Sequence, residues 1–141
     1  MTPTMAIANF ACNVRFNRLP LTVIDKIKQL MLDCLGNQIG AYAEKSAQML
    51  YEVLGVKQTR GKSTVVGYGS KTTPLLAGCM NGMLAHLLDM DDAHRDSLTK
   101  TGSAITPAVM AVAEEFECEG KRVIEAVVAG YEVMIRLGLA V

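Results

Sequence analysis

Apolar residues recur at intervals of three and four along most of the chain, the spacing that places side chains on one face of an α-helix. The longest such run, over residues 22–42, predicts an amphipathic helix with Thr22 as its N-cap. The pattern as a whole predicts an all-α protein, a helical bundle of about five to six helices in a single domain over residues 1–141. The other expected helices cover residues 6–16, 46–54, 74 to about 90, 108–116 and 121–137.

Threonine, proline and glycine mark the expected helix ends. Thr73-Pro74 and Thr106-Pro107 each place a hydroxyl N-cap before a proline in the first turn, so both predict a helix start. Gly55 is expected to end one helix, and Gly120 to separate the last two. Residues 61–69 place β-branched residues between glycines, which is typical of one short strand or an extended loop. A lone strand forms no sheet, so this segment pairs elsewhere or not at all.

Composition excludes several classes of protein. The 141 residues include 14 Lys and Arg and 14 Asp and Glu, so the net charge is zero, whereas a nucleic-acid binder needs a cationic field. There is no Trp to provide a base-stacking platform. The most apolar stretches are too short to span a membrane or are broken by Glu132 and Arg136, and the first residues lack a secretory pattern. We therefore expect a cytoplasmic protein that binds neither nucleic acid nor membrane.

Two features leave alternatives open. The four cysteines, at positions 12, 34, 79 and 118, form no C-x-x-C pair, so they predict neither a zinc nor a redox motif and are expected to be small buried thiols. Beyond the last predicted helix the chain stays apolar up to Val141, with no stop signal. A chain cut inside a larger fold and a buried C-terminal helix explain that ending equally well.

Residues 81–96 concentrate the chemistry, since they hold four of the fourteen acids and both histidines. His86 and Asp89 share a helix face, and Asp89, Asp92 and His94 can converge where that helix ends. Clustered carboxylates and imidazoles transfer protons or bind a metal. Two other interpretations require no function. In one, the acids belong to a solvated loop with Arg95 as their internal partner; in the other, His86 is a core histidine.

The run Asn-Gly-x-x-Ala-His-x-Leu-Asp-x-Asp-Asp-x-His at residues 81–94 resembles the MmgE/PrpD family. So do Gly-Ser-Ala-Ile-Thr-Pro-Ala at 102–108, Leu-Asp-Cys-Leu-Gly at 32–36 and Gly-Tyr-Glu-Val at 130–133. The family includes 2-methylcitrate dehydratase, cis-aconitate decarboxylase and iminodisuccinate epimerase. The resemblance implies the N-terminal part of a large helical domain with the C-terminal domain absent, a homo-oligomer, a small polycarboxylate substrate, and no cofactor or metal.

The resemblance also implies roles for individual residues. Asp89 matches an active-site aspartate of the family, and Asp92 and His94 lie at motif positions, so these three are the predicted catalytic residues. The predicted substrate-binding residues are Asn81, Arg95 and Lys100.

Two positions depart from the family pattern. Ala93 stands where threonine is usual, and Lys100-Thr101 stands where a His-Pro pair is common. A lysine at position 100 binds a carboxylate, and it acts as a base only if burial lowers its pKa.

The implied function is that of a lyase or isomerase acting on a small di- or tricarboxylate, as 2-methylcitrate dehydratase does, by proton abstraction next to a carboxylate. The alternative is a catalytically inactive helical oligomerisation module left by truncation. The 141-residue chain by itself is expected to show little or no turnover, because the motif segment is rich in acids and poor in cations. Exposed apolar faces predict a dimer or higher oligomer.

Overall fold

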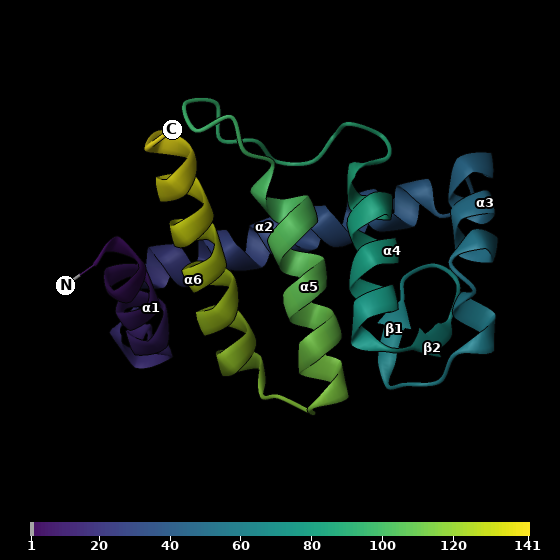
Figure 1. Ribbon diagram of the computed structural model, residues 1–141, viewed down its shortest axis with the longest axis horizontal. Coiled ribbons are helices and arrows are strands. Elements are labelled where there is room, and N and C mark those ends of the chain that lie inside the picture. Colours follow the sequence, from purple (N-terminus) through teal and green to yellow (C-terminus); the bar gives the residue numbers. More distant parts are fainter. Residues whose placement is uncertain (1) are drawn as a thin grey trace.

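The computed structural model describes residues 2–141, and within that range it has six α-helices and one small sheet (Figure 1). This confirms the predicted all-α class. The helices are α1 Pro3–Asn13, α2 Leu21–Ala41, α3 Lys45–Val53, α4 Pro74–His86, α5 Thr101–Glu115 and α6 Gly120–Leu139. Short 3-10 helices cover Phe16–Arg18 and Val56–Gln58, and the strands are β1 Ser63–Val65 and β2 Ser70–Thr72.

The long helix α2 crosses behind α4, α5 and α6, which lie side by side (Figure 1). Two apolar cores hold the helices together. Met80 and Leu84 of α4 are fully buried in one core, together with residues of α3 and the sheet. Val127 of α6 and Ile27 of α2 belong to the other. Each large apolar side chain buried in this way stabilises the fold by about 1.5–3 kcal/mol.

Of the three predicted N-caps, one is correct and two are wrong. The Thr73 hydroxyl accepts a hydrogen bond from the Leu76 amide, and Pro74 opens α4, as expected. Thr22 is not an N-cap, because α2 begins at Leu21 after Pro20. The Thr106-Pro107 start is also wrong, since α5 begins at Thr101 and Pro107 lies inside it, fully buried.

Residues 61–69 belong to a hairpin rather than to a lone strand. β1 pairs antiparallel with β2, with Ser63 opposite Thr72 and Val65 opposite Ser70. Gly67 has a φ of 81°, and a Cβ there would overlap the Tyr42 ring. β2 has the sequence Ser-Lys-Thr, which lacks the apolar alternation that predicts a strand.

Only Cys34 of the four cysteines is buried, so the expectation of buried thiols is wrong for the other three. Cys12, Cys79 and Cys118 lie on solvent-facing parts of α1, of α4 and of the turn before α6. Over residues 2–141, no helix combines the length and the apolar character needed to cross a membrane.

Candidate functional site

The loop over residues 87–100 carries most of the predicted chemistry, and it joins α4 to α5 at one end of the helices (Figure 1). His86 is the last residue of α4, which ends earlier than the pattern predicts. Asp89 has a φ of 53°, a left-handed conformation that aspartate tolerates better than most residues. This conformation turns the chain, and Lys100 then lies directly before α5.

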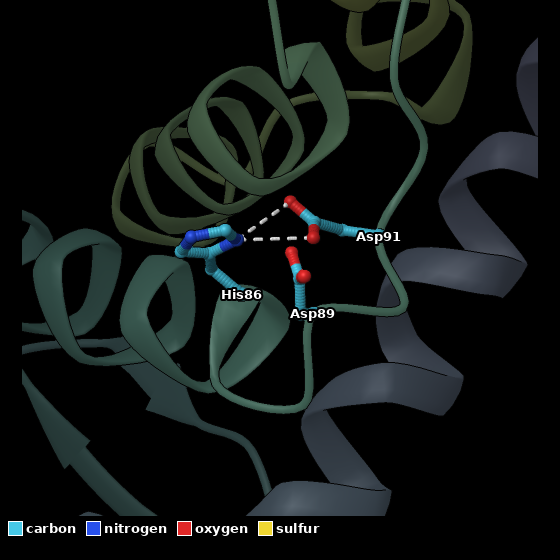
Figure 2. A group of neighbouring side chains, drawn as sticks. All are labelled: His86, Asp89 and Asp91. Carbon is cyan, nitrogen blue, oxygen red and sulfur yellow. Dashed lines mark hydrogen bonds and ion pairs between the residues drawn. The ribbon is translucent and has the colours of Figure 1, made fainter.

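Four side chains from this region form one group, which we call the Lys100 cluster: His86, Asp89, Asp91 and Lys100. Figure 2 shows the His86 ring and the two carboxylates pointing toward one another. The His86 Nδ1 lies 3.0 and 3.1 Å from the two carboxylate oxygens of Asp91. The Lys100 Nζ lies 3.1 Å from Asp91 Oδ1 and also forms an ion pair with Asp89. One ammonium therefore bridges two carboxylates.

The two carboxylates differ sharply in exposure. The Asp91 side chain is 2 % exposed, whereas that of Asp89 is 78 % exposed. Lys100 lies between them, with 36 % of its side chain exposed. The cluster thus has one buried carboxylate and one that faces solvent.

Hydrogen bonds set the charge states in the cluster. The bond from Lys100 lowers the pKa of Asp89. Burial raises the pKa of Asp91, but hydrogen bonds with His86, Ser103 and Lys100 outweigh burial, so the net shift is downward. The bonds to Asp89 and then Asp91 raise the pKa of Lys100. Lys100 therefore carries its positive charge at neutral pH. A charged ammonium can bind a carboxylate, but it cannot accept a proton as a base.

The same side chains have the spacing of metal ligands. One ligand atom each from His86, Asp89 and Asp91 lies within 4.8 Å of the others. Imidazole and carboxylate together suit a borderline or hard divalent cation. The Lys100 ammonium, however, already contacts both carboxylates and supplies the positive charge that a metal would bring. The absence of a metal stays a prediction.

Asp92, predicted to be catalytic, links three elements. Its Oδ1 accepts a hydrogen bond of 2.9 Å from the Gly102 amide in the first turn of α5. Its Oδ2 accepts one of 3.1 Å from the hydroxyl of Tyr131 on α6. A Cβ on Gly102 would overlap Asp92, so the glycine is what allows this approach. The residue at the N-cap position of α5 is Lys100, whose side chain does not cap the helix, and the Asp92 carboxylate takes over that role from ten residues earlier in the chain.

His94 and Arg95 lie in the loop outside the Lys100 cluster. The His94 Nδ1 lies 2.9 Å from the Ser97 hydroxyl, and the His94 backbone forms a bridge with Thr99. Arg95 is exposed, and its carbonyl accepts a hydrogen bond from the Leu98 amide across a tight turn. The cluster therefore includes only Asp89 of the predicted catalytic residues and only Lys100 of the predicted substrate-binding residues.

Asn81 also lies apart from the cluster, on the buried side of α4. Its side-chain amide donates to the Thr64 carbonyl at 2.8 Å, and its Oδ1 accepts from the Val66 amide at 2.9 Å. Asn81 is 4 % exposed and pairs with the edge of β1 as another strand would. A substrate would have to displace this pairing to reach the amide.

Sequence reasoning missed Asp91 as the centre of the cluster. Asp91 lies within the motif at residues 81–94, but nothing in a loop sequence marks which of three neighbouring aspartates is buried. Tyr131 was missed as well, because its partner Asp92 is 39 residues away in the sequence. The one available signal was the His86–Asp89 spacing: the two side chains do lie in one group. The predicted shared helix face is wrong, however, because α4 ends at His86.

The chain belongs to the MmgE/PrpD family, because the model of the MmgE/PrpD N-terminal domain matches residues 5–141. It is 28% identical over 144 residues to the cis-aconitate decarboxylase of Aspergillus terreus, an alignment that covers 98% of this chain and 29% of that protein. It is 25% identical over 135 residues to the cis-aconitate decarboxylase-like protein oryM of Aspergillus oryzae, over 95% of this chain and 27% of that protein. The chain thus spans less than a third of the length of these relatives.

Proposed function

We propose that the chain contributes the Lys100 cluster to the active site of a cofactor-independent lyase or isomerase that acts on a small di- or tricarboxylate. The observation that supports this most is the pairing of an exposed carboxylate, Asp89, with a fully charged ammonium, Lys100, within the motif segment of the family. A relative is named for decarboxylation of cis-aconitate, which is a tricarboxylate.

The residues divide the chemistry as follows. The ammonium of Lys100 binds one carboxylate of the substrate, and Asp89 removes or returns a proton on the neighbouring carbon. His86 and Asp91 hold the ammonium side of the cluster in place. Asp92 is a positioning residue that fixes the loop to α5 and α6. Dehydration, as in 2-methylcitrate dehydratase, decarboxylation and epimerisation all share this proton transfer.

The test uses a chimera in which residues 5–141 replace the matching segment of the Aspergillus terreus enzyme. Proton NMR in D2O follows exchange at the carbons of cis-aconitate and 2-methylcitrate as well as net turnover, so it detects the shared step whichever product forms. We expect activity that falls on the order of 100-fold in Asp89→Asn, the usual size of a general acid–base contribution. The matched control is Asp96→Asn, an exposed aspartate of the same loop.

Circular dichroism and size-exclusion chromatography establish whether the chimera folds. A folded chimera that exchanges no proton contradicts the proposal, and so does an Asp89→Asn chimera with unchanged rate. If the chimera does not fold, titration of the 141-residue chain with carboxylates decides instead. The absence of any effect on the resonances of Lys100 then contradicts the proposed site.

The second candidate is a catalytically inactive helical module that self-associates. An apolar groove between α5 and α6 favours it: its volume is about 330 Å³, and it is lined by alanines and valines together with Cys118 and Arg122. Apolar patches of this kind promote association. In this case light scattering at micromolar concentration shows a dimer or larger oligomer, and no variant of the Lys100 cluster changes any carboxylate titration.

A further inference from the structure

Lys100 has two carboxylate partners of unequal accessibility, and this asymmetry has a consequence for ligand binding. Asp91 is buried, and its carboxylate is also bonded to His86. The Asp89 side chain is 78 % exposed, and Lys100 is its ion-pair partner. Breaking the Lys100–Asp91 contact would leave a charge buried and under-partnered, which is costly, whereas an exposed ion pair is worth little.

We propose that Asp89 is the exchangeable counter-ion of Lys100: a carboxylate of the ligand displaces Asp89 from the ammonium while Asp91 stays bound. The inference rests on the proposed function, from which it takes the polycarboxylate class of the ligand. It adds that the site in its unliganded form is closed by its own aspartate, which competes with the ligand.

The backbone at Asp89 suits this exchange. Asp89 lies at the turn where α4 has ended, and among the residues the structure describes its side chain forms a hydrogen bond and an ion pair only with Lys100. Asp91 has contacts from two directions, with His86 at the end of α4 and Lys100 at the start of α5. The two carboxylates are therefore held by different numbers of partners, and the one with fewer is the one that leaves.

Displacement also changes the acidity of Asp89. The Lys100 hydrogen bond is the main cause that lowers the Asp89 pKa, while His86 lowers it and Asp91 raises it to a smaller extent. When the ligand takes over the ammonium, the Asp89 pKa rises toward its ordinary value. The freed carboxylate then lies beside the bound acid as a stronger proton acceptor than in the closed site.

The experiment titrates the 141-residue chain with tricarballylate, a saturated tricarboxylate that cannot be dehydrated or decarboxylated as the proposed substrates can. Dissociation constants come from amide chemical shifts in wild type, Asp89→Asn and Lys100→Met. Because the competing exposed ion pair is lost, we expect Asp89→Asn to bind about two- to fivefold tighter than wild type. Lys100→Met is expected to lose binding at least tenfold.

The chain offers a matched control in Glu117→Gln. Glu117 is also exposed, has a left-handed φ of 52° and is paired with a lysine, Lys62. Its replacement removes the same charge from a similar ion pair away from the loop, so it is expected to leave tricarballylate binding unchanged. A second readout is the pH titration of the Asp89 carboxylate carbon, whose pKa should rise when tricarballylate saturates the protein.

Several results overturn the inference. Equal tightening by Asp89→Asn and Glu117→Gln shows an effect of net charge rather than exchange. Weaker binding by Asp89→Asn, an Asp89 pKa unmoved by saturating ligand, or no binding in either wild type or Asp89→Asn also contradicts it. If tricarballylate displaces Asp89 but the chimera shows no turnover, only the proposed reaction is refuted. If the chimera shows turnover but tricarballylate does not displace Asp89, only the inference about the counter-ion is refuted.

Discussion

Replacement of Asp92 by alanine should destabilise the fold by removing two hydrogen bonds at once. The Gly102 amide in the first turn of α5 loses its 2.9 Å acceptor, and a capping bond of this kind is worth about 1 kcal/mol. The Tyr131 hydroxyl, on a residue only 7 % exposed, loses its 3.1 Å acceptor. A buried polar group left without a partner costs about 1–3 kcal/mol. The expected loss in the free energy of unfolding is therefore about 2–4 kcal/mol.

Urea denaturation followed by helical circular dichroism at pH 7 measures this loss. With a slope of about 2 kcal/mol per molar urea, typical of a small domain, the midpoint should fall by about 1–2 M. Asp96→Ala is the matched control, because it removes an exposed aspartate from the same loop and should change stability by less than about 0.5 kcal/mol.

A double-mutant cycle with Tyr131→Phe isolates the hydrogen bond between Asp92 and the hydroxyl. Both single variants remove that bond, so the double variant should lose less than the sum of the two single losses. Strict additivity, or an Asp92→Ala midpoint equal to that of Asp96→Ala, would refute the view that Asp92 joins the loop to α5 and α6.

Three further outcomes are expected. Asn81→Ala should lose about 2–4 kcal/mol and speed hydrogen exchange at the Val66 amide, since two backbone groups lose a buried partner; unchanged exchange there contradicts this pairing. At pH 8 a thiol reagent should modify the three exposed cysteines quickly and Cys34 only on unfolding, because burial raises the pKa of that thiol to about 12; a fourth fast equivalent contradicts its burial. Asp91 has a lowered pKa when folded, so its stabilising contribution is present above its ordinary pKa and is lost as the pH falls below about 4. Asp91→Asn should therefore make the acid loss of stability shallower, and an unchanged slope contradicts that assignment.

Most helices could be predicted from the sequence because their apolar spacing and their end signals are local. The long run in α2 and the Thr73-Pro74 start of α4 are signals carried within a few residues. The start of α5 could not be found in this way, since the side chain that caps its first turn comes from Asp92 in the preceding loop. Thr106-Pro107 has the local pattern of a start, but the tertiary cap at Gly102 decides where the helix begins.

In the candidate site, too, some features have a local origin and others depend on tertiary contacts. The spacing of His86 and Asp89 predicted one group, and the two side chains do lie together, although Asp89 lies beyond the end of α4. The burial of Asp91 depends on the left-handed turn at Asp89, and the place of Asp92 depends on how α6 packs. The residue types of the loop alone therefore predict neither the burial of Asp91 nor the position of Asp92.

The Asp-x-Asp-Asp motif thus combines three different physical roles. Asp92 is fixed by helix termini and packing, Asp91 is buried against a cation, and Asp89 alone keeps its carboxylate in solvent. Two acids share the single ammonium of Lys100, so a tricarboxylate adds like charges to a cluster with no surplus of cations. At about 4 Å each added like-charge pair opposes binding by about 1 kcal/mol in water and about 4 kcal/mol at an effective dielectric of 20. Displacing Asp89 relieves only one such pair, so tight binding of a whole tricarboxylate requires further cationic groups from outside the Lys100 cluster.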